Sequence, residues 1–167
     1  MKLDISSLGN AIVDVQFSIE ENFVSKLEKM SIPKGSMTLI EAEEQSNLIG
    51  LLKKDYGEPI LSCGGAVTNS IVAASNFGSA CHLSCKVRND DLGIFYLENL
   101  SKNNVLHSQK ASESDLSTGQ SVIMVTPDAE RTMCTCLGIS SFLSSSDLDK
   151  SAIRNSNYLF LEGHLVA

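Results

Sequence analysis

The sequence contains no tryptophan and only three prolines among its 167 residues. No segment approaches the run of about 18 apolar residues that a membrane-spanning helix needs. The N-terminus meets Asp4 at once and lacks an apolar stretch followed by a cleavage site, which argues against a secretion signal. The net charge of −7 argues against nucleic acid, because binding to a phosphate backbone requires clustered Lys and Arg. We therefore expect neither a membrane nor a nucleic acid among the partners.

The composition is that of an ordinary globular domain. Hydrophobic residues make up 43% of the sequence and charged residues 20%, which is not the usage of a disordered chain. A chain of this length can bury a sizeable core in one domain. We therefore expect one globular domain.

The five cysteines are odd in number and irregular in spacing. Cys81 and Cys85 fit the spacing of a zinc pair only loosely. Within residues 80–87, Cys81 and Cys85 both belong to the set of every second residue, which would point to one face of a strand. Small apolar side chains occupy such positions on the buried face of a strand. We favour this core interpretation and expect no metal ligands in the chain. Reduced thiols indicate the cytoplasm.

Strand-like and helix-like segments alternate, which favours an α/β layer fold. Strands 59–63 and 157–161 are expected to be buried. Thr38 and Glu41 have the spacing of a capping box for the helix that follows. Helices are predicted over residues 20–30, 41–54, 65–77 and 91–103, and strands over 3–8, 11–18, 36–40, 59–63, 80–87, 119–126, 131–137 and 157–161.

The motif at residues 9–14 places two polar side chains near the start of a strand. Asn10 lies in the turn, and Asp14 lies on the strand that leaves it. Both side chains can form hydrogen bonds with adjacent hydroxyl groups of a small molecule. The alternative is a turn asparagine bonded to its own backbone and an aspartate on an exposed strand face.

A second motif, at residues 63–69, is a glycine turn that opens onto a helix. Gly64 and Gly65 permit backbone conformations closed to other residues and let a ligand approach the main chain. The helix N-terminus behind them favours an oxygen-rich or anionic ligand. Asn69 follows Gly65 by one helical turn and is expected to face the same side. The alternative is a tight strand-to-helix turn that binds nothing.

Other polar residues give weaker indications. Arg131 follows the predicted turn 127–130 and is a candidate for contact with a phosphate, although a solvated hairpin arginine is the usual alternative. His82, His107 and His164 have no spacing that indicates a catalytic triad, so we expect structural roles for them. The sequence has neither a Walker phosphate-binding loop nor a G-x-G-x-x-G fingerprint, which argues against Walker-type ATPases and dinucleotide dehydrogenases.

Taken in order, the motifs resemble those of the ribokinase-like (PfkB) carbohydrate kinase family, in its adenosine kinase-like branch. Each motif would be weak alone, but their common order along nearly the whole chain is specific. They are Gly-Asn-x-x-x-Asp at 9–14, Ile-Pro-Lys-Gly-Ser-Met at 32–37 and Gly-Gly-Ala-x-x-Asn at 64–69, followed by residues 86–93, 118–119, 126–133, 137–138 and 162–163.

The resemblance implies an α/β fold, namely a ribokinase-like three-layer sandwich with a central, mostly parallel sheet and a small β lid. The lid strands are expected at about 11–18, 36–40 and 119–137. The resemblance also implies that residues 1–167 are the N-terminal part of one kinase domain. The C-terminal half, with most of the ATP site, is then absent, and the chain is truncated. Exposed lid strands would also join two copies in a homodimer.

The resemblance implies an activity as well. It is the ATP- and Mg²⁺-dependent transfer of the γ-phosphoryl group to a hydroxymethyl group of a sugar or nucleoside, either adenosine-like or ribose-like. Arg131 is the candidate for stabilising charge on the transferred phosphoryl group. The residues implied to contact substrate hydroxyls are Asn10, Asp14, Gly64, Gly65 and Asn69.

Two departures from the family pattern limit this expectation. The family's catalytic Gly-Ala-Gly-Asp motif, whose aspartate is the general base, has no counterpart here, and Cys85 and Arg88 stand where many relatives carry glycine. We therefore expect the chain of 167 residues to bind substrate weakly at best and not to turn over. The alternatives are a non-catalytic sugar- or nucleoside-binding or interaction module, and a Rossmann-type oxidoreductase that the missing fingerprint disfavours.

Overall fold

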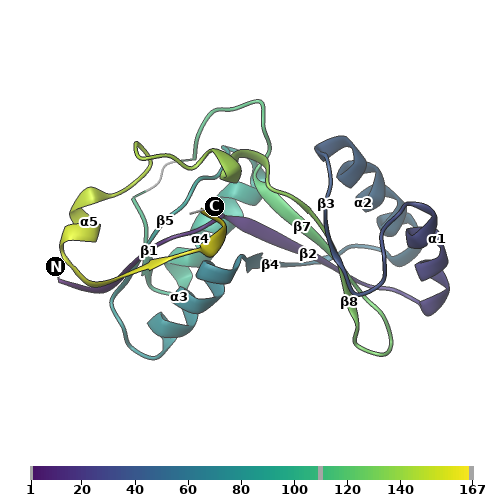
Figure 1. Ribbon diagram of the computed structural model, residues 1–167, viewed down its shortest axis with the longest axis horizontal. Helices are drawn as coiled ribbons and strands as arrows, with labels where there is room; N and C mark the ends of the chain where they lie inside the picture. Colours follow the sequence, from purple (N-terminus) through teal and green to yellow (C-terminus); the bar gives the residue numbers. More distant parts are fainter. Residues whose placement is uncertain (1, 109–110, 166–167) are drawn as a thin grey trace. The chain divides into compact units, whose positions relative to one another are not determined.

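The chain forms two compact units (Figure 1). A computed structural model describes residues 2–108 and 111–165. Unit 1 comprises Met1–Val13, Cys63–Gly119 and Gly138–Ala167, and unit 2 comprises Asp14–Ser62 and Gln120–Leu137. No helix in the described part of the chain is long and apolar enough to cross a membrane.

Unit 1 is built on a parallel four-stranded sheet with the strand order β6-β5-β1-β9. Strand β1 lies at the centre, where Ile5 is opposite Cys81 on one neighbour and Tyr158 on the other. The carboxyl ends of these strands therefore lie along one edge of the sheet. The strands are β1 (Leu3–Leu8), β5 (Cys81–Ser84), β6 (Val105–Leu106) and β9 (Ser156–Leu161).

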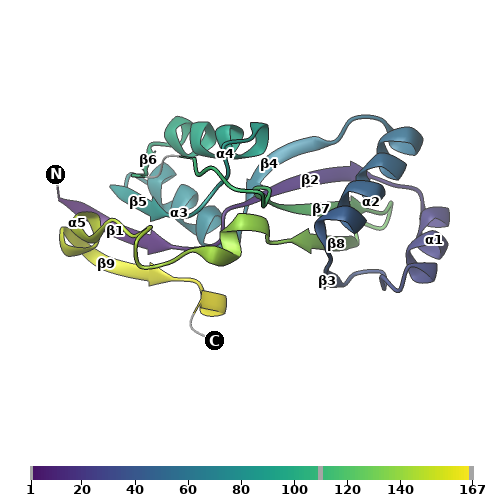
Figure 2. The ribbon, with the colours of Figure 1, turned by 90° about the horizontal axis from the view of Figure 1, so that it is seen from above.

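Helices make the crossovers that parallel pairing requires. Helices α3 and α4 lie on one side of the sheet (Figure 2), where α3 packs against β1, β5 and β6, and α4 packs against β6. Helix α5 packs against β1 and β9. Asp90 caps α4 and Asp149 caps α5, because each carboxyl group accepts a backbone N–H three residues ahead at 2.8 Å. The helices are α3 (Ala66–Asn76), α4 (Asp91–Lys102) and α5 (Lys150–Arg154), with short 3-10 turns at Gly138–Phe142 and Gly163–Leu165.

A second sheet, with the strand order β3-β8-β7-β2-β4, forms most of unit 2. Its β7–β8 hairpin is antiparallel, and the Ala129 N–H donates to the Thr126 carbonyl at 2.9 Å in the connecting turn. The buried Gln45 of α2 ties helix to sheet, since its amide donates to the carbonyl groups of Gln120 and Cys134 at 2.9 and 3.1 Å. The elements are β2 (Ile12–Ser18), β3 (Met37–Leu39), β4 (Ile60–Gly64), β7 (Gly119–Val125), β8 (Arg131–Cys136), a 3-10 turn at Glu21–Phe23, α1 (Val24–Lys29) and α2 (Ala42–Tyr56).

Two strands that were expected to be buried are exposed. Ile60 on β4 is 68% exposed and Tyr158 on β9 is 72% exposed. Among the described residues, both strands lie at the edge of their sheets, and each pairs with one neighbouring strand. An apolar sequence does not reveal whether a strand is central or at an edge, which is why this prediction was wrong.

Two local predictions were also wrong. Thr38 does not cap α2, because it lies in β3 opposite Cys134, and the N-cap residue Glu41 makes no side-chain capping hydrogen bond. The strand predicted at 80–87 spans only Cys81–Ser84, and all four of its residues are buried. Alternation fails there because β5 is a central strand of a parallel sheet, and such strands are typically covered on both faces. Cys81 and Cys85 are both buried, as the core interpretation predicted.

Candidate functional site

In unit 1, two turns meet at the carboxyl ends of β1 and β4. Gly9 and Asn10 follow β1, and Gly65 is the N-cap of α3 with a φ of 95°. A Cβ atom on Gly65 would lie 2.6 Å from the Asn10 carbonyl oxygen, and a Cβ atom on Gly9 would lie 2.6 Å from the Cβ of Val67. Both approaches are too close for any side chain. Glycine is therefore required at both positions.

Asn10 combines a fixed backbone with an unsatisfied side chain. Its backbone N–H donates to Oε2 of Glu162 at 2.7 Å. The residue is only 9% exposed, and its side-chain Oδ1 is buried and has no hydrogen-bond partner among residues 2–108 and 111–165. A buried amide oxygen that lacks a donor costs free energy. Asn10 Oδ1 is therefore an oxygen with a free capacity to accept a hydrogen bond.

Glu162 is a residue of the site that sequence analysis missed. It follows β9, is 8% exposed, and its backbone N–H donates to the Leu8 carbonyl at 3.2 Å. The motif at residues 162–163 was noticed, but no role was assigned to it. Only the parallel pairing of β1 with β9 brings this carboxyl group to Asn10, because carboxyl ends of parallel strands meet at one edge.

The helix that follows the glycine turn presents its N-terminus beside Gly65. The backbone N–H of Asn69 donates to the Gly65 carbonyl at 3.0 Å, which forms the first helical hydrogen bond. Gly64 is buried and Asn69 is exposed. The start of α3 offers backbone donors and a positive dipole end to an oxygen-rich group.

Unit 2 brings together the other two predicted site residues, Asp14 on β2 and Arg131 at the start of β8. Asp14 is partly exposed and Arg131 is exposed. Burial raises the pKa of Asp14, and the positive charge of Arg131 lowers it, with burial the larger effect. Asp14 can accept hydrogen bonds from hydroxyl groups, and Arg131 can interact with an anion.

An ion cluster holds the hairpin that carries Arg131. Lys34 Nζ lies 2.7 Å from Glu21 Oε1 and 2.8 Å from Asp128 Oδ2. The hydrogen bond from Lys34 is the largest cause that lowers the pKa of Asp128. Gly35 N–H also donates to Thr132 Oγ1 at 3.0 Å. Residues of two sequence motifs, 32–37 and 126–133, therefore join to hold the turn before Arg131.

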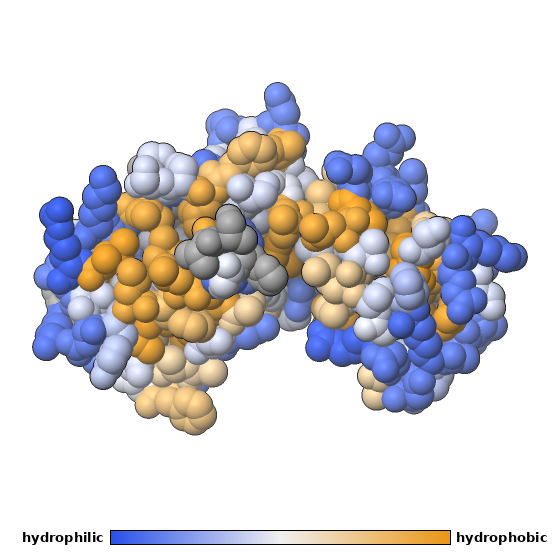
Figure 3. Space-filling model, viewed as in Figure 1, coloured by the Kyte–Doolittle hydropathy of each residue, from blue (hydrophilic) through white to orange (hydrophobic). Residues whose placement is uncertain are grey.

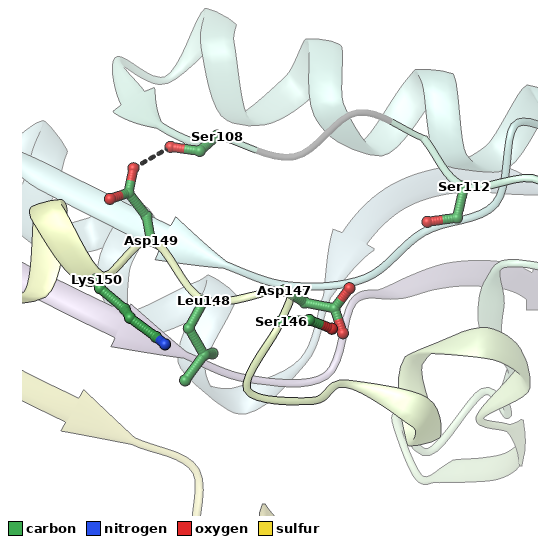
Figure 4. A pocket seen from close by; sticks show the side chains of 7 residues that line it. All are labelled: Ser108, Ser112, Ser146, Asp147, Leu148, Asp149 and Lys150. Carbon is green, nitrogen blue, oxygen red and sulfur yellow. Dashed lines mark hydrogen bonds between the residues drawn. The ribbon is translucent and has the colours of Figure 1, made fainter.

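A polar hollow in unit 1 lies elsewhere (Figure 4) and is lined by none of the predicted site residues. Its volume is about 620 Å³. Its carboxyl groups have structural partners: Asp149 caps α5 and accepts the Ser108 hydroxyl, and Asp147 accepts Lys86 Nζ at 3.1 Å. The lining residues are Ser108, Ser112, Ser146, Asp147, Leu148, Asp149 and Lys150.

Residues 2–108 and 111–165 hold no group of three or more His, Cys, Asp or Glu side chains that could bind a metal ion. Two of the three histidines bond to serine hydroxyl groups: His82 Nε2 lies 3.2 Å from Ser108 Oγ, and His107 Nε2 lies 3.2 Å from Ser101 Oγ. The His164 side chain lies outside the described part of the chain.

Comparison with known sequences identifies relatives. Residues 36–167 match the family described as pfkB family carbohydrate kinase. Ribokinase from Mus musculus is 33% identical over 95 residues, which cover 57% of this chain and 29% of the relative. Ribokinase from Dictyostelium discoideum is 30% identical over 104 residues, which cover 61% of this chain and 33% of the relative. The chain therefore matches about a third of each curated relative.

Solved structures share the fold over almost the whole chain. Adenosine kinase from Sinorhizobium meliloti superposes with a TM-score of 0.86 at 30% identity, covering 99% of this chain and 49% of that one. A probable sugar kinase from Rhizobium etli gives a TM-score of 0.85 at 28% identity, covering 99% and 48%. The chain spans about half the length of these structures. Their likeness confirms the ribokinase-like α/β fold with a mostly parallel central sheet, and the match over residues 36–167 shows that the chain belongs to the pfkB carbohydrate kinase family.

Proposed function

We propose that this chain is the substrate-binding part of an ATP-dependent kinase that phosphorylates a hydroxymethyl group of a sugar or a nucleoside. One observation carries the proposal: Asn10 Oδ1 is buried, has no hydrogen-bond partner in the described part of the chain, and sits on a backbone that Glu162 and Gly65 hold in place. A hydroxyl group of the substrate supplies the missing donor. The family and its ribokinase and adenosine kinase relatives support a sugar or a nucleoside as the substrate.

Each predicted site residue has a role in this proposal. In unit 1, Asn10 accepts a substrate hydroxyl, and Gly64 and Gly65 let the substrate approach the main chain at the start of α3, where Asn69 offers its exposed amide. Because phosphoryl transfer depends mainly on positioning and electrostatics, rigid hydroxyl-binding groups suit this chemistry. In unit 2, Asp14 accepts hydroxyl hydrogen bonds, and Arg131 stabilises negative charge on the transferred phosphoryl group.

We also propose that residues 1–167 are the N-terminal part of one kinase domain, with β2, β3 and the β7–β8 hairpin as its lid. The remainder would supply the general base and most of the ATP site. Two observations support this proposal: the chain spans about half the length of its structural neighbours, and the edge strand β9 exposes Tyr158, Leu159, Phe160 and Leu161. Figure 3 shows hydrophobic residues, in orange, gathered over the part of unit 1 that holds β1 and β9.

The remaining parts of the proposal concern the phosphoryl donor, the location and the assembly. ATP is the proposed donor and Mg²⁺ its accompanying ion, both on the family resemblance. A cytoplasmic location is proposed because none of the five cysteines, all within the described residues, forms a disulfide. A homodimer through the lid is proposed because Met37 and Leu39 of the edge strand β3 are 55% and 61% exposed.

The proposal is tested with the coding sequence and the purified protein. The reading frame is followed beyond Ala167, and a continuation with a Gly-x-Gly-Asp stretch at a helix start supports the kinase. ATP-dependent phosphorylation of ribose and adenosine is then measured for the continued protein and for residues 1–167. Turnover by residues 1–167 alone contradicts the proposal that the remainder of the domain supplies the general base and most of the ATP site. Tight binding of ribose, fructose or adenosine without any turnover in either protein supports the binding module instead.

A further inference from the structure

We propose that the buried hydroxyl groups of Thr68 and Tyr96 form a positioning pair for Asn10, because they hold the Gly65 turn against the Asn10 backbone. The pair touches no substrate itself and acts through Gly65. The inference rests on the proposed function in one respect only, which is that Asn10 binds the substrate.

The pair joins the start of α3 to the middle of α4. Tyr96 is completely buried and Thr68 is 1% exposed. Their hydroxyl oxygens lie 2.5 Å apart. Burial raises the pKa of Tyr96 well above its usual value, so the phenol keeps its proton. A hydrogen bond between two buried hydroxyl groups is costly to break, because the separated groups lack water.

The Thr68 hydroxyl lies beside the turn that packs against Asn10. Its Oγ1 lies 3.4 Å from the place where a Gly65 Cβ would be, and that same place lies 2.6 Å from the Asn10 carbonyl oxygen. Gly65 is therefore enclosed between the Thr68 hydroxyl and the Asn10 main chain. Val67, the neighbour of Thr68, makes the equivalent close approach to Gly9. The N-cap residue Gly65 and Val67 in the first turn of α3 thus lie against the two residues Asn10 and Gly9.

Asn10 is held from a second direction by Glu162, which accepts its backbone N–H at 2.7 Å. With its main chain fixed from both directions, Asn10 keeps Oδ1 buried and without a partner. Release of the α3 turn lets the Asn10 backbone move, and the side chain then loses its binding position. A role in positioning is therefore distinct from a general contribution to stability.

Matched substitutions separate the hydroxyl group from the volume of the side chain. Thr68→Val removes the hydroxyl and keeps the shape, whereas Thr68→Ser keeps the hydroxyl and removes a methyl group. Tyr96→Phe removes the other hydroxyl. Tyr56→Phe, on α2 in unit 2, is the control for the same chemical change at a tyrosine that packs edge-on against Phe23.

The first measurement is amide hydrogen exchange by NMR on the chain of 167 residues, which needs no ligand. We expect Thr68→Val and Tyr96→Phe to speed exchange of the Asn10 and Asn69 backbone amides by about three- to tenfold, the range expected from loss of one hydrogen bond. Thr68→Ser and Tyr56→Phe should leave these two amides unchanged. Unchanged exchange in Thr68→Val, or an equal acceleration of all amides of unit 1, overturns the inference.

The second measurement is the affinity for adenosine and for ribose, in the wild-type and Asn10→Ala backgrounds. Thr68→Val should weaken binding by about three- to tenfold in the wild-type background and should cause no further loss in Asn10→Ala. Equal losses of affinity on Thr68→Val in the two backgrounds overturn the inference, because the effect of a residue that does not act through Asn10 adds to the effect of Asn10→Ala. If the wild-type chain of 167 residues binds neither probe, affinity is measured on the continued protein; absence of binding there overturns the proposed function for these substrates, and the exchange measurement decides the positioning role separately.

Discussion

The backbone N–H of Asn10 donates a 2.7 Å hydrogen bond to Oε2 of Glu162, a residue 152 positions further along the chain. The bond exists because β1 and β9 pair in parallel, so the residues that follow them meet at one edge of the sheet. It fixes the residue whose side-chain oxygen is the best candidate for contact with a substrate hydroxyl.

Loss of the Glu162 carboxyl group should destabilise the chain. Glu162→Ala leaves the buried Asn10 N–H without an acceptor, so we expect the free energy of unfolding to fall by about 1–3 kcal/mol. Glu162→Gln keeps an amide oxygen as acceptor and should cost less. Urea unfolding followed by circular dichroism measures the difference. Equal losses of stability in the two variants would show that the hydrogen bond from the Asn10 N–H to Glu162 does not contribute to stability.

Two glycines with the same positive φ angle allow backbone strain to be compared with close packing. Gly65 and Gly78 both have a φ of 95°, but only Gly65 is pressed against another main chain, and nothing lies within 4 Å of a Cβ on Gly78. Gly78→Ala should cost about 1 kcal/mol through backbone strain alone. Gly65→Ala should cost clearly more because it forces Asn10 away. Chemical denaturation of both variants provides the comparison, and similar losses contradict the packing argument.

The stability should depend on the protonation of His82. Burial lowers the pKa of this imidazole, Asp149 opposes the effect, and His107 adds to it. The folded state therefore favours the neutral form. Its contribution is present above the unfolded pKa of about 6.5 and is lost as the pH falls through the lower folded value.

Urea unfolding measured from about pH 7.5 to about pH 5, a range that spans the unfolded pKa of about 6.5, should show this loss of stability in the wild type. The loss should be smaller in His82→Gln. NMR also determines which ring nitrogen of the neutral His82 carries the proton. Ser108 donates its proton to Asp149, so His82 must donate from Nε2 and leave Nδ1 as an unprotonated acceptor. A neutral His82 protonated at Nδ1 would contradict this hydrogen-bond pattern.

Arg131 should lower the pKa of Asp14 through its charge. Arg131→Gln removes the opposing charge and leaves burial as the dominant cause, so the pKa of Asp14 should rise further. Arg131→Lys keeps the charge and should change the pKa less. Carboxyl carbon shifts followed by NMR during a pH titration measure both variants. An unchanged Asp14 in Arg131→Gln would mean that the two side chains do not interact.

The exposed strand β9 should make the chain of 167 residues self-associate. An edge strand with exposed apolar side chains pairs readily with other chains. Leu159→Lys, at a position 49% exposed, should shift sedimentation toward the monomer, whereas Phe77→Lys, at a position 91% exposed outside any strand, should not. Monomeric behaviour of the wild type at high concentration would contradict this prediction.

Sequence analysis predicted the elements that depend on local chemistry. The predicted strands and helices and the hairpin around residues 127–130 follow from patterns within a few residues, whereas β6 and α5 were not predicted. The motifs at 9–14 and 64–69 were identified for the same reason, since their glycines and polar residues are close in the chain. The family assignment from those motifs was confirmed by the match over residues 36–167.

Exposure and long-range contacts could not be predicted in this way. The strands β4 and β9 are as apolar in sequence as buried strands, but their position at sheet edges exposes them. Thr38 has the spacing of a cap, yet pairing with β8 places it in a strand.

The sequence by itself determined the α/β order of the elements, the glycine turns and the family. Only the tertiary structure decided that Glu162 meets Asn10, that Tyr96 meets Thr68, and that Asn10 Oδ1 stays buried without a partner. The physical reason is that periodicity and turn chemistry act between neighbours in the chain. Parallel pairing and helix packing join residues that are far apart, and these contacts depend on register and burial that no local pattern encodes.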